Sequence, residues 1–212
     1  MSRIRIVIVV GLAAPLLFGC EQFFSNNLLS GARRDPSQLS FDQQISYAES
    51  ARNSGDKEAM ADAYAALSET LEEENNTDPE LNRLAAELAV GASGLTDTVP
   101  DLLDAAVQGD LSNKDDVAAS VNDALDEVDY DYINEAADQI DKIKENGGTV
   151  SKEQYVFVGA GLMMEDAEEA GGVENIDPSS ESKQFADEAA EDLESRGEDA
   201  GLIGELSDLY GE

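Results

Sequence analysis

The sequence predicts an all-α protein, built as an array of antiparallel helical hairpins with about eight or nine helices. Two observations lead to this fold class. Apolar residues recur three and four positions apart in one segment after another, which is the period of an amphipathic helix. Capping-box patterns, in which Ser or Thr is followed three residues later by Glu, Gln or Asp, begin several of these segments. They start at Ser40, Thr77, Ser112 and Ser151, which lie 35 to 39 residues apart.

A period of this length is typical of stacked helical pairs, in which each pair buries its apolar stripe on the next. The sequence leaves two arrangements open, an open α-solenoid and a compact helical bundle.

The first predicted pair begins at Ser40, which precedes a helix with Phe41, Ile45 and Ala48 on one face. Gly55 supplies a C-terminal stop, and Asp56 caps the second helix directly afterwards. The stripe of that second helix consists of Met60, Tyr64, Leu67 and Leu71. Because so short a turn joins them, we expect the two helices to lie antiparallel and close.

The remaining elements follow the same signals. A helix opened by Thr77 carries Leu81, Leu84 and Leu88, and we expect it to end near Gly91. Further helices are predicted over 98–109, 112–125 and 133–143, and from Ser151 to Gly171. A loop over 172–180 precedes an amphipathic helix with Phe185, Ala189 and Leu193, and a short helix is predicted over 202–210.

The first pair resembles a tetratricopeptide repeat in its small residues and its Gly-Asp turn. The matching positions are Tyr47, Ala48, Gly55, Asp56, Ala59, Ala63, Ala66 and Pro79. The turn is one residue short, and the chain has no tryptophan to supply the signature residue of the family. The resemblance therefore implies a tetratricopeptide-like array of α-hairpins and assigns no peptide-binding residues.

A different pattern occupies the first twenty residues. Arg3 and Arg5 precede an apolar run over 6–19, which is shorter than the roughly 20 residues that span a bilayer and suits a signal peptide. The only cysteine, Cys20, follows Leu17, Phe18 and Gly19.

This segment resembles the type II signal peptide of bacterial lipoproteins, whose lipobox has an aliphatic residue three positions before the cysteine and a small residue directly before it. The resemblance implies a diacylglycerol on the sulfur of Cys20, cleavage before that residue, and acyl chains such as palmitate that hold the protein on a membrane. An uncleaved signal anchor with a chance cysteine is the alternative.

Three segments follow from these patterns. Residues 1–19 are expected to be the signal peptide, residues 20–38 a lipidated tether rich in turn residues, and residues 39–212 the helical domain. The implied location is the cell envelope, on the inner or outer membrane, with the domain facing the periplasm or the exterior.

Composition excludes several functions. The chain has a net charge of −34, with 47 acidic and 13 basic residues, so nucleic acid is not expected as a partner. It has no histidine, which removes the commonest general base and most zinc sites. The acids are spread over every segment rather than gathered in one tail. Because salt screens their repulsion, we predict an acidic, halophilic protein from brine.

Candidate sites are few. The most apolar stretch after the signal is 155–164, in which Tyr155, Phe157, Gly159 and Gly161 could either pack a buried helix or line a ligand cavity. A buried helix is the simpler interpretation.

The acidic clusters over 126–131 and 165–169 could hold Ca²⁺ but do not fit an EF-hand, and solvated surface explains them better. Ser151-Lys152 and Ser112 with Lys114 could suggest a serine–lysine dyad, but capping explains both serines. We expect no catalytic residues, no metal and no cofactor.

The sequence thus predicts a membrane-anchored, non-enzymatic scaffold or adaptor for another, unidentified envelope protein. Assembly of envelope proteins and support of a solute transporter are roles suggested by analogy of fold and anchor. The alternative is a lipoprotein that binds a small hydrophobic ligand or lipid.

Overall fold

The computed structural model describes residues 35–96, 128–171, 175–201 and 203–204. Within these residues the chain is all-helical, with six α-helices and one short 3₁₀ turn, η1 (Pro36–Gln38), and without a β-strand. The sequence predicted eight or nine helices for the whole domain. The helices expected over 98–109 and 112–125, and all but two residues of the one over 202–210, lie outside the described residues.

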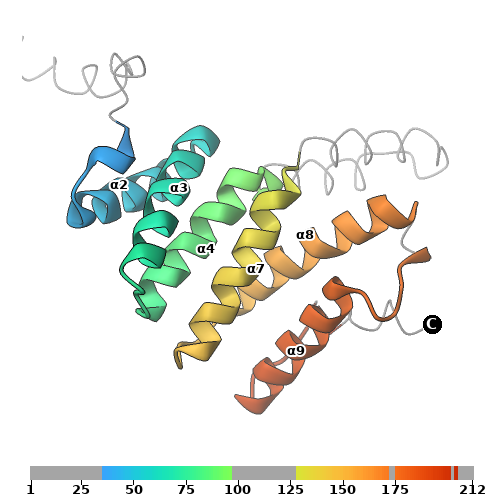
Figure 1. The fold of residues 1–212 in the computed structure, drawn as a ribbon. Helices are drawn as coiled ribbons and strands as arrows, with labels where there is room; N and C mark the ends of the chain where they lie inside the picture. Colours follow the sequence, from blue (N-terminus) through green and yellow to red (C-terminus); the bar gives the residue numbers. More distant parts are fainter. Residues whose placement is uncertain (1–34, 97–127, 172–174, 202, 205–212) are drawn as a thin grey trace, which may run out of the picture. The chain divides into compact units, whose positions relative to one another are not determined.

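The six helices belong to the unit that begins at Leu39, whereas η1 belongs to the unit before it. Figure 1 shows them in chain order, with bounds α2 (Phe41–Ser54), α3 (Lys57–Glu73), α4 (Pro79–Ser93), α7 (Tyr130–Glu145), α8 (Lys152–Ala170) and α9 (Glu181–Ser195). No helix in the described part of the chain is both long enough and apolar enough to cross a membrane.

The predicted start and stop of α2 and the predicted start of α3 are confirmed. The Gln43 side chain accepts a hydrogen bond of 3.2 Å from the backbone amide of Ser40, which is one half of the expected capping box. Gly55 ends α2 in the left-handed conformation with φ 66°, a region that glycine enters without the steric penalty of a Cβ. The Asp56 carboxylate then accepts a hydrogen bond of 3.0 Å from the amide of Ala59 and begins α3.

Two predicted boundaries of α4 were wrong. The helix begins after Asp78, not Thr77, because the Asp78 carboxylate accepts from the Glu80 amide at 2.9 Å and Pro79 suits the first helical position. It continues through Gly91 to Ser93 and ends at Gly94, whose φ is 84°. Gly91 is not a stop: a Cβ on it would overlap the side chain of Met60, so this glycine lets α3 approach α4.

Helix α4 is the centre of the unit. It packs most extensively on α7 and also contacts α2, α3 and α8. Its buried positions therefore lie on every side of the helix rather than on one stripe. They are Asn82, Leu84, Ala85, Ala86, Leu88, Ala89, Val90, Gly91, Ala92 and Ser93. The many alanines allow neighbouring helices to approach closely from several directions.

The second half of the unit follows the predicted stripes. Ile133, Ala136, Ile140 and Ile143 of α7 are fully buried, as are Ala189 and Leu193 of α9. Helix α8 lies between these elements, since it contacts both α7 and α9 and, less extensively, α4. Its start at Ser151 and its stop at Gly171, with φ 72°, are as the sequence predicted.

Candidate functional site

The residues of the predicted lipobox, Leu17, Phe18, Gly19 and Cys20, lie outside the described residues. Of the sites singled out in the sequence, the described chain includes the apolar stretch of α8 over 155–164, with Tyr155, Phe157, Gly159 and Gly161. The structure gives Tyr155, Gly159 and Gly161 definite neighbours and places Phe157 at the wall of a cavity.

Tyr155 is 1% exposed and joins α8 to α9. Its hydroxyl donates a hydrogen bond of 2.9 Å to Oδ2 of Asp192, and its ring meets the ring of Phe185 edge-on at a centroid distance of 6.0 Å. Burial, followed by the hydrogen bond to the Asp192 carboxylate, raises the pKa of Tyr155 far above its ordinary value. The phenol therefore stays protonated at all physiological pH values and acts as a donor.

The two glycines of α8 are positions of close approach. A Cβ on Gly159 would lie 2.6 Å from Cδ1 of Ile203, and a Cβ on Gly161 would lie 2.8 Å from Cγ2 of Ile133. Ile203 and Ile133 are themselves fully buried. Buried side chains of the protein therefore fill the space that a side chain at each glycine would take.

Phe157 is the member of the set that borders open space. A cavity of about 240 Å³ lies between α4 and α8, lined mainly by the hydrocarbon of Ala86, Val90, Phe157 and Val158. Ligand sites usually measure about 300–1,000 Å³, so this cavity suits only a small apolar group. On its polar side is Gln154, whose Nε2 is buried without a hydrogen-bond partner among the described residues.

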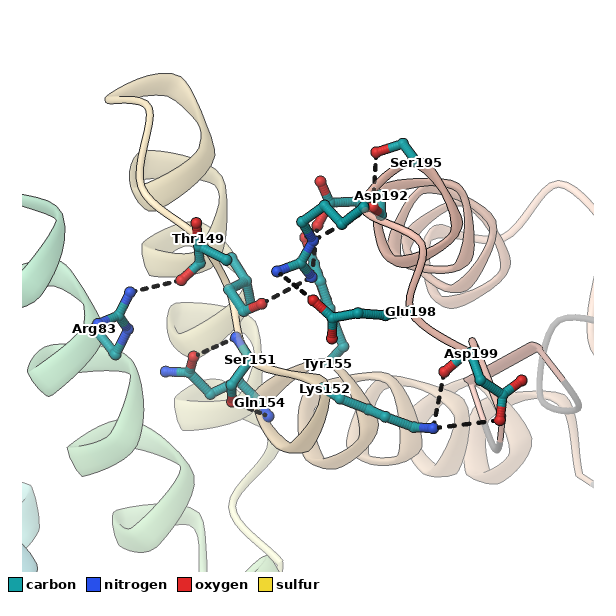
Figure 2. Close-up of polar contacts among 12 residues, drawn as sticks. Arg83, Thr149, Ser151, Lys152, Gln154, Tyr155, Asp192, Ser195, Glu198 and Asp199 are labelled. Atoms are coloured by element: carbon teal, nitrogen blue, oxygen red, sulfur yellow. Dashed lines mark hydrogen bonds and ion pairs between the residues drawn. The ribbon is translucent and has the colours of Figure 1, made fainter.

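A polar network surrounds the turn that joins α7 to α8 (Figure 2). From one side the Arg83 guanidinium donates to the carbonyl of Thr149 at 2.6 Å, and from the other side Arg196 donates to the carbonyl of Val150 at 3.0 Å. Arg196 also forms an ion pair of 3.1 Å with Asp192, the acceptor of Tyr155. Two arginines of a chain poor in basic residues are thus used to hold one turn.

Asp192 and Arg196 were not among the residues predicted from the sequence. They form an i,i+4 pair of opposite charge at the end of α9, and that spacing was a signal that could have been followed. Their link to Tyr155 depends on tertiary packing, which the spacing does not reveal.

Ser151 and Lys152 serve separate purposes. Ser151 Oγ accepts from the Gln154 amide at 3.2 Å, and the Gln154 side chain accepts from the Ser151 amide at 3.0 Å. Lys152 instead reaches the backbone carbonyl of Asp199, to which its Nζ donates at 2.8 Å (Figure 2). The capping explanation of Ser151 is confirmed, whereas Ser112 and Lys114 lie outside the described residues.

The acidic cluster of α8 makes hydrogen bonds with side chains of α7 and α9. The Asn134 amide donates to both carboxylate oxygens of Glu165 at 3.1 Å, and the Ser182 hydroxyl donates to Asp166. Burial, together with Glu169 and Asp166 nearby, raises the pKa of Glu165. Within the described ranges no group of three or more Asp, Glu, Cys or His side chains could hold a metal ion.

A second cluster of titratable groups joins α3 to α7. Burial and the nearby Glu135 carboxylate raise the pKa of Tyr64, which hydrogen-bonds to Glu135 and Gln139. The ring of Tyr64 meets that of Tyr132 edge-on at 5.9 Å. This cluster thus joins α3 to α7 through the Tyr64 hydroxyl and the two rings.

Comparison with known proteins identifies no relative of this chain. The chain matches no family model, no curated protein and no solved structure.

Proposed function

We propose that this protein is a lipoprotein of the bacterial cell envelope whose helical body serves as a non-enzymatic scaffold or adaptor for another envelope protein. The observation that carries the proposal is the segment Leu17-Phe18-Gly19-Cys20, in which the only cysteine of the chain follows an apolar run with a cationic start. A diacylated cysteine holds a protein on a membrane through its acyl chains, each methylene of which contributes about 0.8 kcal/mol.

The helical body supports an interaction role rather than a chemical one. The residues that the sequence singled out on α8 pack against α7, α9 and Ile203, and the polar networks join helices to turns. The sequence left an open tetratricopeptide-like solenoid and a closed bundle, and the main contacts of α4, with α3 and α7, are with the neighbouring predicted pairs and suit either arrangement. In a solenoid each repeat contacts only its neighbours.

The anchor is tested by Cys20→Ser in the full chain, expressed in a bacterial host. The variant should lose labelling by palmitate and move from the membrane fraction to the soluble fraction. A matched control places the thiol elsewhere: Ser30→Cys in the Cys20→Ser background should not restore labelling. A Cys20→Ser protein that still fractionates with the membrane would refute the lipid anchor.

The adaptor role is tested by affinity capture of the tagged protein from detergent-solubilised envelope, with mass spectrometry of the bound proteins. The proposal expects one envelope protein to be enriched in stoichiometric amount, and to remain enriched when the Cys20→Ser variant is used as bait. Capture that yields no such protein would remove the adaptor role and leave the anchor as a separate result.

A second candidate function is the binding of a small hydrophobic ligand, favoured by the apolar cavity beside Phe157. Native mass spectrometry should then show a co-purifying ligand. Ala86→Leu, which narrows the cavity, should lower its occupancy, whereas Ala65→Leu on the exposed side of α3 should not. Equal occupancy in the two variants would place any ligand elsewhere.

A further inference from the structure

The apolar cavity between α4 and α8 is bordered by a hydrogen-bond donor that the described residues leave unpaired. The cavity measures about 240 Å³, and most of its surface is the hydrocarbon of Ala86, Val90, Phe157 and Val158. An engineered apolar cavity of about 150 Å³ binds benzene, so this one has room for a ring with a small substituent. Gln154, which also lines the cavity, is 9% exposed, and its Nε2 has no hydrogen-bond partner among the described residues.

The Gln154 amide cannot be turned over to pair this donor. Its Oε1 accepts a hydrogen bond of 3.0 Å from the backbone amide of Ser151. Turning the amide over would place its NH₂ group against that N–H, so that two donors would meet. In Figure 2 the Gln154 side chain extends from α8 toward α4, the helix that forms the opposite wall of the cavity. The capping bond thus holds Nε2 on the side of α8 that borders the cavity.

The unpaired donor determines which group a ligand must bring. Buried polar groups are almost always paired, and Nε2 is already buried before any ligand binds. A ligand with an acceptor therefore gains a hydrogen bond there without the protein losing one. A carbonyl oxygen is such an acceptor, and a ketone or ester brings no donor of its own that the apolar wall would leave unpaired.

Charge limits the ligand further. A cation would offer no acceptor to Nε2 of Gln154. An anion would have to enter hydrocarbon beside two carboxylates of the lining, Glu87 and Glu153. Glu87 is paired with Arg52 at 2.8 Å, but the chain as a whole carries a net charge of −34. The ligand that fits this cavity is therefore neutral.

We propose that this cavity binds a small neutral carbonyl compound, a ketone or ester with an apolar body, whose carbonyl oxygen accepts a hydrogen bond from Nε2 of Gln154. The apolar body lies against Val90, Phe157 and Val158. This inference rests on the second candidate function, the binding of a small hydrophobic ligand, and names the chemical class of that ligand.

The test compares three probes of similar size on the full chain, purified in detergent. Acetophenone has a carbonyl group, α-methylstyrene has a CH₂ group in place of the carbonyl oxygen, and benzoate is an anion. Equilibrium dialysis with the same detergent on both sides gives each Kd, because micelles then take up a probe equally in the two compartments. Acetophenone and α-methylstyrene should bind, and benzoate should not. Benzoate that binds as tightly as acetophenone would overturn the assignment of a neutral ligand.

One variant removes the donor. Gln154→Met replaces the amide by an apolar side chain of similar length, and it should weaken the binding of acetophenone by about tenfold, the effect of one good hydrogen bond. The Kd of α-methylstyrene should not change. The matched control is Gln43→Met, which removes the corresponding capping-box residue of α2 at an exposed position outside the cavity. This control should leave both Kd values unchanged.

Two results would overturn the inference, and they differ in what else they remove. An effect of Gln154→Met that is the same for acetophenone and α-methylstyrene would refute the hydrogen bond and leave the second candidate function intact. Failure of both probes to bind the wild type would remove that function as well. If Gln154→Met does not fold, the infrared carbonyl band of acetophenone bound to the wild type decides. A hydrogen bond should lower its frequency below the value in hexane, and an unshifted band would refute the proposed donor.

Discussion

The hydroxyl of Tyr155 donates a hydrogen bond of 2.9 Å to Oδ2 of Asp192, and this contact fixes α8 against α9. The donor is 1% exposed, whereas the side chain of Asp192 is 33% exposed and also pairs with Arg196. One carboxylate thus receives a buried neutral donor on one side and a guanidinium on the other. Removing the hydroxyl while keeping the ring should therefore measure what the hydrogen bond alone contributes to stability.

Tyr155→Phe should lower the free energy of unfolding by about 1–2 kcal/mol. A hydrogen bond to a charged group contributes about 1.5–3 kcal/mol, and the partial exposure of Asp192 places this one near the lower limit. The edge-on contact with Phe185 survives because the ring remains. Urea unfolding followed by circular dichroism would measure the change.

The control for this prediction is Tyr132→Phe. The Tyr132 ring meets Tyr64 edge-on, but its hydroxyl makes no hydrogen bond with the described residues, so the variant should stay within about 0.5 kcal/mol of wild type. Equal losses in the two variants would mean that the Tyr155 hydroxyl contributes nothing specific.

Gly161→Ala should destabilise the protein by about 1–2 kcal/mol. The new methyl would lie 2.8–3.1 Å from three side-chain carbons of Ile133, which is fully buried and has no room to move. Overpacking of this kind costs about 1–3 kcal/mol, against which the helix gains up to about 1 kcal/mol from alanine.

A double-mutant cycle identifies the cause. In an Ile133→Ala background the added methyl of Gly161→Ala enters vacated space, so the same substitution should become neutral or stabilising. A loss that is equal in both backgrounds would show that Ile133 is not the obstacle.

Local signals were sufficient to predict much of this fold from the sequence. Both ends of α2 and α8 and the start of α3 depend on neighbouring residues alone, such as Asp56 with the Ala59 amide and Ser151 with Gln154. The predicted start of α4 was wrong by one residue because two possible capping residues, Thr77 and Asp78, are adjacent. Pro79 favours the first helical position, which makes Asp78 the capping residue.

Long-range relationships could not be predicted. The pairing of α4 with α7 joins segments separated by more than thirty residues, and the burial of α4 on all sides is carried by alanines, which form no recognisable stripe. Gly159 and Gly161 of α8 were singled out from the sequence, but the side chains that approach them, Ile203 and Ile133, could not be predicted.

Mild acid should stabilise the protein. Burial is the largest cause that raises the pKa values of Glu135, Asp141 and Glu165 in the folded state. A carboxyl with a raised pKa binds its proton more tightly when folded, so folding gains stability as the pH falls through the folded pKa toward the ordinary values of 4.5 and 3.8. The stabilisation is lost again as the pH rises through the folded pKa.

The measurement is Tm by circular dichroism from pH 8 to pH 5 at constant ionic strength. Tm should rise toward pH 5, and Glu165→Gln should flatten part of the rise, whereas Glu168→Gln at an exposed position of the same helix should not. A Tm that falls between pH 7 and pH 5 would contradict the assignment.

Salt should raise Tm, and the way Tm depends on salt concentration should show that salt acts by screening charge repulsion. Every lysine and arginine of the described residues contacts a carboxylate or a backbone carbonyl, as Lys57 does at the carbonyl of Ser93 and Lys144 at Glu188. Salt weakens these attractions too. They are few beside the repulsion among 47 acidic residues, so the net effect of screening is stabilising.

The Debye length falls from about 10 Å at 0.1 M to about 3 Å at 1 M, and most of that change comes at the low end. Tm should therefore rise steeply in the first few tenths molar NaCl and flatten above about 1 M, and KCl should give the same curve because screening depends on ionic strength alone. A rise that stays linear to several molar would indicate exclusion of salt from the protein surface instead. A Tm that does not rise at all would refute the view that this acidic surface is suited to brine.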